Sequence, residues 1–61
     1  MADIAVYTTS PATAKACAAN LGHHLEVPGV DEGGAPLTAA GVVVGVEIAG
    51  SGRFRVTVRI D

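Results

Sequence analysis

The sequence predicts a small α+β domain of the order βα(β)ββ, in which a C-terminal antiparallel hairpin joins a sheet with one helix packed on one face. Three observations favour this fold: the alternation of side chains in residues 41–61, an apolar strand at residues 3–9, and an alanine-rich run between residues 10 and 22. A chain of 61 residues holds one domain, residues 1–61.

The C-terminal hairpin is predicted from how its residues would pair. If Gly50, Ser51 and Gly52 form a three-residue turn with glycine supplying left-handed backbone, residues equally distant from Ser51 face each other. One set of pairs is then apolar: Ile48 with Phe54, Val46 with Val56, Val44 with Val58, and Val42 with Ile60. The other set is Ala49 with Arg53, Glu47 with Arg55, Gly45 with Thr57, and Val43 with Arg59. A shift of one residue would place valine opposite arginine, so the pattern specifies the register.

The first strand and the helix follow from local signals. Residues 3–9, DIAVYTT, predict a strand with Ile4 and Val6 on one face. Ser10 and Pro11 are typical of a helix start, because serine caps the free N–H groups and proline lacks one. The run that follows is rich in alanine, the best helix former, and Gly22 stands where a left-handed residue ends a helix. The predicted buried stripe is Ala14, Cys17, Ala18 and Leu21.

Two further segments complete the predicted layout. Residues 23–27 are interpreted as a short strand or an extended exit from the helix, and residues 28–41, rich in glycine and proline, as a loop. One helix covers only one face of a sheet. The other face is therefore predicted to be open to solvent or to a partner, and to carry Tyr7, Val43, Glu47, Arg53, Arg55, Thr57 and Arg59.

Composition indicates a thin core. The chain is 49% hydrophobic but only 3% aromatic, and a domain of this length buries only about 60% of the surface that its unfolded chain exposes. The single Cys17 excludes an internal disulfide, so a homodimer or another partner subunit is the expected support. No basic region precedes an apolar run at the N-terminus, and no segment approaches a membrane span. We therefore expect a cytoplasmic protein.

The stretch IAVYTTSPATAKACAANLG resembles the start of glutaredoxins and related thioredoxin-fold redoxins, in which a strand ending in Tyr-Thr leads to Cys-Pro-x-Cys at a helix start. This chain has Ser10, Pro11, Ala12 and Thr13 at that motif, so neither thiol is present. Dithiol exchange requires a thiolate there and a resolving thiol. The resemblance implies a shared strand-to-helix turn, and a degenerate redoxin fragment without redox thiols remains an alternative.

Other chemistry has no recognisable set of residues. His23 and His24 are metal-ligand types with Glu26 nearby, but adjacent histidines in an extended segment point to opposite sides. Ser10 and Ser51 have cap and turn explanations, and no base stands at a recognisable spacing from either. The sequence therefore predicts no enzyme, no metal site and no cofactor.

The residues predicted to bind a partner lie on the open sheet face. Arginine and tyrosine often carry the energy of protein interfaces, which favours a protein-binding surface formed by Tyr7, Glu47, Arg53, Arg55 and Arg59. An acidic segment adds Glu26, Asp31 and Glu32, which would steer a basic partner. The same arginines suit nucleic acid, although a pairing of Glu47 with Arg55 and a net charge of -2 make that alternative weaker.

The favoured hypothesis is a non-enzymatic protein-binding module. In size, acidity and lack of an active site, the chain is similar in kind to small proteins of phages and mobile elements, including anti-CRISPR inhibitors. Such proteins block nucleic-acid-handling complexes by covering a surface. This similarity depends on no motif, so the identity of the partner stays open.

Overall fold

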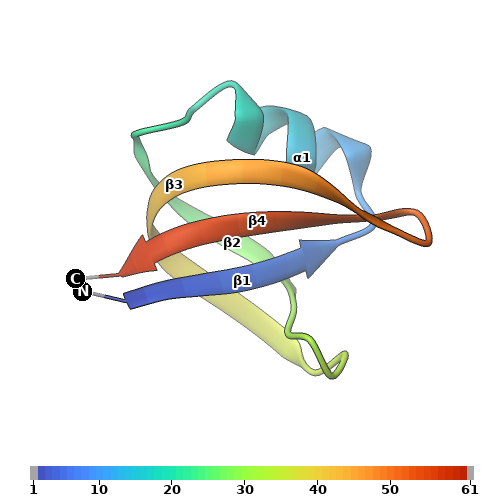
Figure 1. Ribbon diagram of the computed structural model, residues 1–61. Helices are drawn as coiled ribbons and strands as arrows, with labels where there is room; N and C mark the ends of the chain where they lie inside the picture. The colour runs from blue at the N-terminus through green and yellow to red at the C-terminus, as the bar shows by residue number, and fades with distance from the viewer. Residues whose placement is uncertain (1, 61) are drawn as a thin grey trace.

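The computed structural model describes residues 2–60 as five elements around one small core (Figure 1). They are β1 (Ala2–Thr8), α1 (Pro11–Ala18), β2 (His24–Val30), β3 (Pro36–Gly50) and β4 (Arg53–Ile60). All strand pairs are antiparallel, and the sheet closes into a four-stranded barrel in the order β1-β2-β3-β4, with β1 also paired to β4. No helix in this part of the chain is long and apolar enough to cross a membrane.

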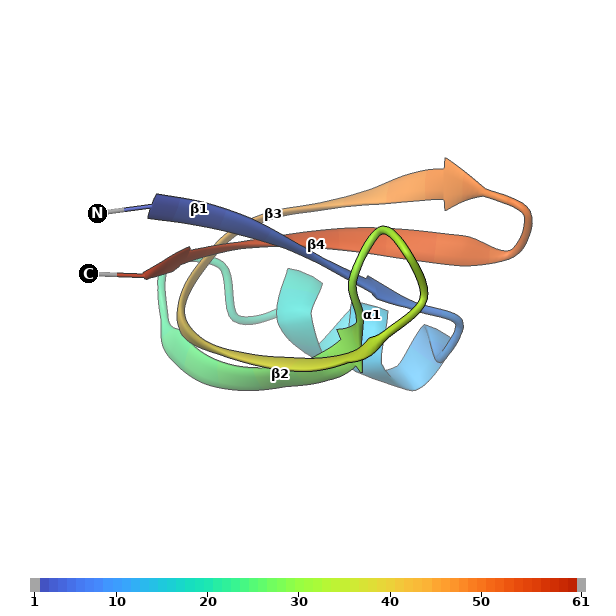
Figure 2. The same ribbon diagram turned by 90° about the horizontal axis from the view of Figure 1, so that it is seen from below.

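The predicted open sheet with one helix on one face is wrong. The order of the first elements agrees with βα(β)ββ, but the sheet curls until β1 meets β2 at the pair Tyr7–Val30. Seen from below, β2 and α1 lie on the same side of the layer formed by β1, β4 and β3 (Figure 2). The helix therefore shares the inner face with β2 instead of covering that face alone.

The predicted loop at residues 28–41 is also wrong, because most of it is strand. β2 continues to Val30, a short turn follows, and β3 begins at Pro36. β3 is long enough to pair with two strands. Its residues 36–42 pair with β2, and its residues 42–50 pair with β4. The composition of this segment predicts a loop because glycine and proline usually mark turns, and here they lie within strands.

Two glycines in these strands permit the close approach that shapes the barrel. A Cβ on Gly29 would collide with the carbonyl oxygen of Tyr7 on β1, and a Cβ on Gly41 would collide with the carbonyl oxygen of Arg59 on β4. Glycine within a strand often marks such a contact between backbones. Their role is therefore to let neighbouring strands touch, and not to end a strand.

The hairpin of β3 and β4 confirms the predicted register near the turn and departs from it further away. Four predicted pairs are confirmed: Gly45 with Thr57, Val46 with Val56, Glu47 with Arg55, and Ile48 with Phe54. The turn itself is shorter than predicted, because Gly50 pairs with Arg53 in place of Ala49. Ser51 and Gly52 both have positive φ, 55° and 73°, as the common two-residue hairpin turn requires.

A bulge at Val44 reverses the predicted faces of the next residues. Beyond it Val43 pairs with Val58 and Val42 pairs with Arg59, where the prediction had Val44 with Val58 and Val42 with Ile60. Val43 is consequently fully buried, whereas Val44 is 39% exposed. The expectation that Val43 lies on the open face is therefore wrong, since the extra residue turns it into the core.

The helix begins as predicted and ends earlier. The Ser10 hydroxyl accepts a hydrogen bond from the Thr13 N–H at 3.2 Å, and Pro11 is the first helical residue. Of the predicted buried stripe, Ala14 and Cys17 are buried, but Ala18 and Leu21 are exposed. The reason is that α1 stops at Ala18, after which Gly22, with φ of 85°, directs the chain toward β3.

The core is thin, as the composition predicts. The largest fully buried side chains are five valines, Val6, Val27, Val43, Val56 and Val58. Cys17 and Ala39 complete the cluster, and larger side chains such as Ile4 and Leu25 only partly enter it. Each valine contributes little buried apolar area, so the free energy of unfolding is small. A small loss of packing therefore removes a large fraction of it.

Candidate interaction face

The outer face of β1, β4 and β3 carries rows of side chains that cross the three strands. One row joins Tyr7, Arg55 and Glu47, and another joins Asp3, Arg59 and Val42. Residues directly opposite in an antiparallel pair share one face, so these rows point away from the core valines. The structure therefore brings Tyr7, Glu47, Arg55 and Arg59 to one face, and Val43 is not among them.

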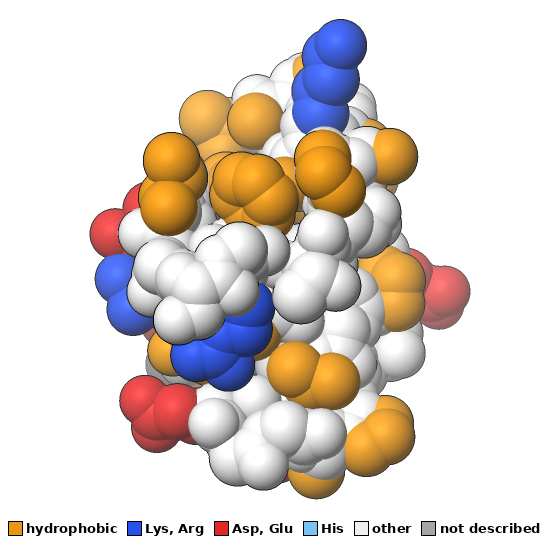
Figure 3. All heavy atoms as spheres, turned by 90° about the vertical axis from the view of Figure 1, so that its right-hand side faces the viewer, with side chains coloured by type: hydrophobic (Ala, Val, Ile, Leu, Met, Phe, Trp, Pro, Cys, Tyr) orange, Lys and Arg blue, Asp and Glu red, His pale blue; other side chains and the backbone are white. Residues whose placement is uncertain are grey.

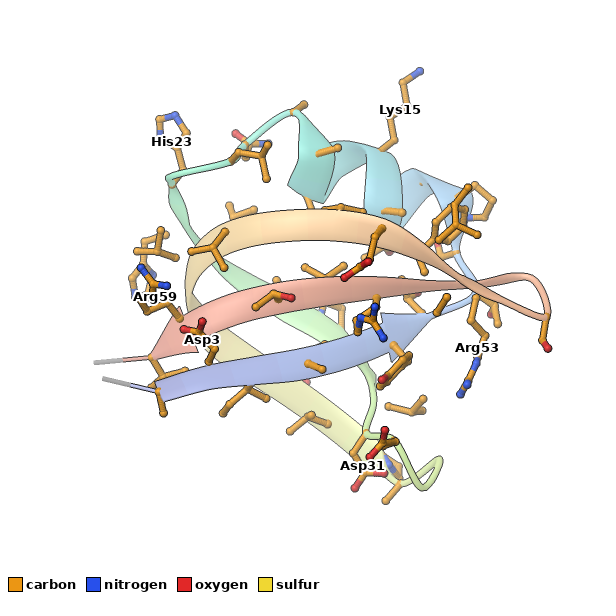
Figure 4. The ribbon with its side chains drawn as sticks, viewed as in Figure 1. Asp3, Lys15, His23, Asp31, Arg53 and Arg59 are labelled. Atoms are coloured by element: carbon orange, nitrogen blue, oxygen red, sulfur yellow. The ribbon has the colours of Figure 1, made fainter. Side chains whose placement is uncertain are left out.

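Two of the three arginines are neutralised by carboxylates on this face. Arg55 Nη2 lies 2.8 Å from Glu47 Oε1, and Arg55 Nε donates to the same oxygen at 3.1 Å. Arg59 makes a two-point contact with Asp3, with Nε to Oδ1 at 2.9 Å and Nη2 to Oδ2 at 3.3 Å (Figure 4). Hydrogen bonding of Arg55 to Glu47, and then to Tyr7, raises the pKa of Arg55, so its charge is permanent.

Asp3 is the residue of this face that the sequence interpretation missed. It pairs with Arg59 because the first and last strands lie side by side, with Asp3 opposite Arg59 in the register. These two strands are far apart in the chain, so the sequence around Asp3 contains no signal that it pairs with Arg59. The only available signal was the matching alternation of residues 3–9 and 53–60, which indicates two strands but does not join them.

Tyr7 and Arg53 form the most distinctive contact of the face. The Arg53 guanidinium carbon lies 4.8 Å from the centre of the Tyr7 ring, an arrangement in which the cation is attracted to the ring face. Tyr7 is therefore only 6% exposed, although it lies on the outer side of β1. Beside this contact is a shallow hollow, the Tyr7–Arg53 hollow, lined by Tyr7, Thr8, Thr9, Gly29, Val30 and Arg53.

Arg53 differs from the other two arginines in having no carboxylate within ion-pair distance in residues 2–60. Its side chain projects from the hairpin end of the molecule (Figure 4). The guanidinium is held against an aromatic ring, and its N–H groups donate to no protein acceptor among the described residues. Such a group is ordered before binding and can donate several hydrogen bonds to a carboxylate or carbonyl of a partner.

The acidic residues predicted as a second contact belong to two different elements of the structure. Glu26 is an exposed residue within β2, and Asp31 and Glu32 belong to the turn before β3. Asp31 Oδ1 accepts hydrogen bonds from the N–H groups of Gly33 and Ala35, both at 2.9 Å. Asp31 therefore stabilises the turn at residues 31–35, which is the part of the predicted loop that is not strand.

No group of three or more metal-ligand side chains gathers within residues 2–60. Cys17 is 3% exposed, and burial raises the pKa of its thiol. Both properties disfavour a reactive thiolate at this position.

No family model, curated protein or solved structure matches this chain. The distinctive features of its surface are the Tyr7–Arg53 hollow and the neutralised rows beside it.

The Asp3–Arg59 pair predicts a measurable titration. The hydrogen bond from Arg59 holds the pKa of Asp3 below its ordinary value of 3.8, against a smaller opposing effect of burial. A lowered folded-state pKa stabilises the fold above pH 3.8, and this contribution is lost as the pH falls through the folded value. Carbon-detected NMR should give an Asp3 midpoint below 3.8, returning toward that value in Arg59→Gln. An unchanged midpoint in the variant would contradict the ion pair.

Proposed function

We propose that this protein is a non-enzymatic protein-binding module that contacts its partner through the Tyr7–Arg53 hollow. The observation that carries the proposal is Arg53, which is stacked on Tyr7 and has no carboxylate partner in the described chain. Arginine and tyrosine are enriched among the residues that dominate binding energy. A carboxylate or a backbone carbonyl at the edge of a partner protein fits the free N–H groups of this guanidinium.

The charge pattern supports a protein partner over nucleic acid. Affinity for phosphate backbones grows with the number of free cations that neutralise phosphates. On the outer face Arg55 and Arg59 are already paired with Glu47 and Asp3, so Arg53 is the one arginine of residues 2–60 without an ion pair. One such cation supports weak, salt-sensitive binding at most, and the neutral rows around it suit a protein surface.

The mode of action in this proposal is occlusion. The small domain would act in the cytoplasm by covering a site that a larger assembly needs, as an inhibitor carried by a phage or a mobile element would. The redoxin alternative is disfavoured by the burial of Cys17 and by the raised pKa of its thiol. The acidic residues Glu26 and Glu32 remain exposed and available for a secondary contact at the edge of the interface.

The test compares two identical substitutions on one strand. Arg53→Gln removes the guanidinium that has no carboxylate partner, whereas Arg59→Gln removes one that is already bonded to Asp3. Tagged proteins are used to capture partners from a host lysate, and each captured protein is quantified by mass spectrometry. We expect Arg53→Gln to lower recovery of the main partner by about tenfold or more, as loss of a dominant interface residue does, while Arg59→Gln retains it.

Two outcomes would overturn this proposal. The first is recovery of the same partner at the parent level by Arg53→Gln, because the hollow would then be uninvolved. The second is retention of an arbitrary duplex or single strand by the parent protein at ~50 mM salt with a steep loss on adding salt, which is the signature of nucleic-acid binding.

A further inference from the structure

One edge of β3 has no strand beside it at the hairpin end. β2 pairs with β3 only as far as Val42, and the chain before β2 extends this pairing to Val43, whose C=O accepts from Gly22 at 2.8 Å and whose N–H donates to His23 at 3.1 Å. From Val44 to Gly50, β3 pairs with β4 alone among the described strands. Alternate N–H and C=O groups of this stretch, the open β3 edge, therefore face away from β4 and can accept another strand.

The exposed large apolar residues concentrate along the open β3 edge. Three such residues are exposed in residues 2–60: Leu21 at 52%, Val44 at 39% and Ile48 at 79%. Val44 and Ile48 belong to the edge itself, and Leu21 directly precedes the residue that bonds to Val43. Natural edge strands are usually protected by lysine, proline or a covering element, but the only charged residue in 44–50 is Glu47, which is occupied by Arg55.

An apolar groove accompanies this edge. It lies between α1 and the inner side of the hairpin and is lined by Pro11, Ala14, Lys15, Ala18, Val46, Glu47, Ile48 and Phe54. The space-filling view of this end shows apolar side chains gathered in a band, with basic side chains above and below it (Figure 3). The helix wall of the groove includes the small side chains of Ala14 and Ala18, whereas Ile48, which is 79% exposed, projects from the strand wall. The surface therefore offers a recess and a protruding side chain next to each other.

We infer that the open β3 edge and this groove bind a second copy of the same chain. Two β3 strands would pair antiparallel about a two-fold axis near Val46, which sets Val44 of one copy beside Ile48 of the other. Each Ile48 would then reach the alanine wall of the opposite groove. A two-fold contact uses the same patch on both subunits, which requires the patch to be complementary to itself.

The charges of the groove meet that requirement. Its lining holds one cation, Lys15 on the helix wall, and one anion, Glu47 on the strand wall. Bringing the helix wall of one copy to the strand wall of the other sets Lys15 near Glu47 twice. Arg55 contacts only Oε1 of Glu47, so this carboxylate can also meet Lys15 of the other copy. A basic partner would instead oppose Lys15 with like charge. Lys15 has no carboxylate within ion-pair distance in the described chain, so it is free to make this contact.

The thin core supplies the reason for self-association. The fully buried side chains are all valines, and domains of this length usually need support from a disulfide, a metal or a second subunit. Residues 2–60 contain no disulfide and no group of three metal ligands. Pairing across the open β3 edge joins two barrels into one continuous sheet and buries the exposed Ile48 in both.

The test measures molar mass in solution. Sedimentation and light scattering of the parent protein should give twice the chain mass of 6.1 kDa at micromolar concentration. Ile48→Lys and Val44→Lys should each give a monomer with a parent-like circular dichroism spectrum, since both side chains are exposed in the single chain. The dissociation constant should rise about 100-fold or more for Ile48→Lys, because two buried isoleucines are lost in each dimer.

A matched control and a charge reversal complete the design. Thr38→Lys places the same charge on an exposed part of β3 that pairs with β2, so this variant should remain a dimer. Lys15→Glu should weaken the dimer, because it sets a carboxylate near Glu47 of the other copy, and Lys15→Gln should weaken it less. A monomeric parent at high concentration, a dimeric Ile48→Lys, or a Lys15→Glu dimer as tight as the parent would overturn the inference. Arg53→Gln leaves the edge intact and should remain dimeric, so the two proposals fail independently.

Discussion

Replacing Gly41 with alanine is expected to leave the protein without a cooperative unfolding transition. An added Cβ at this position would collide with the carbonyl oxygen of Arg59 and lie 3.0 Å from a methyl carbon of Val58. The first of these is backbone in a paired strand, so it cannot move aside without separating β3 from β4. A core of this size stabilises the folded state by only about 3–5 kcal/mol, and separating two strands would cost at least as much.

Thermal melting followed by circular dichroism checks this expectation, with Gly45→Ala as the matched control. Gly45 lies on the same strand, and a Cβ there would meet nothing within 4 Å. The control should melt at the parent temperature or slightly above it, because glycine within a strand is entropically unfavourable. A Gly41→Ala protein that melts like the parent would show that β3 and β4 do not touch at this point.

Replacing Val43 with aspartate is expected to unfold the protein, whereas Val42→Asp should be tolerated. Val43 is fully buried among valines, so a carboxylate there would cost about 4 kcal/mol or more. Val42 lies on the outer face opposite Arg59, where a carboxylate meets a cation across the strands. Urea unfolding of the two variants measures the difference directly.

This pair of variants also decides the register. The alternation of the sequence alone places Val42 in the core and Val43 opposite Arg59, which is the reverse of the structure. An unfolded Val42→Asp together with a folded Val43→Asp would restore the simple register and remove the bulge at Val44.

The hairpin shows how far the sequence could predict the fold. Near the turn the partners of Val46, Glu47 and Ile48 were correct, because apolar and charged residues alternate there and a shift of one residue would be unfavourable. At Val42, Val43 and Val44 the same method failed. Three identical side chains in succession look alike in either register, so a one-residue bulge among them leaves no trace in the pattern.

The closure of the sheet was not predictable for a different reason. Gly29 and Gly41 resemble loop residues, and their function is visible only when the strands they approach are in place. For the candidate interaction face, too, some contacts were predictable from the sequence and others were not. Glu47 and Arg55 were correctly paired from the hairpin, but the Asp3–Arg59 pair and the covering of Tyr7 by Arg53 depend on β1 lying beside β4.

The position of β4 has a consequence for how the chain acquires its structure during synthesis. β4 lies between β1 and β3, and the register joins Ala2 to Ile60 (Figure 1). Contacts between the two ends of a chain close the largest loop and form slowly. On a ribosome, β1 and α1 emerge early and must wait, with their apolar sides uncovered, until residues 53–60 leave the exit tunnel. The barrel therefore closes only after β4 has been translated, because β4 pairs with both β1 and β3.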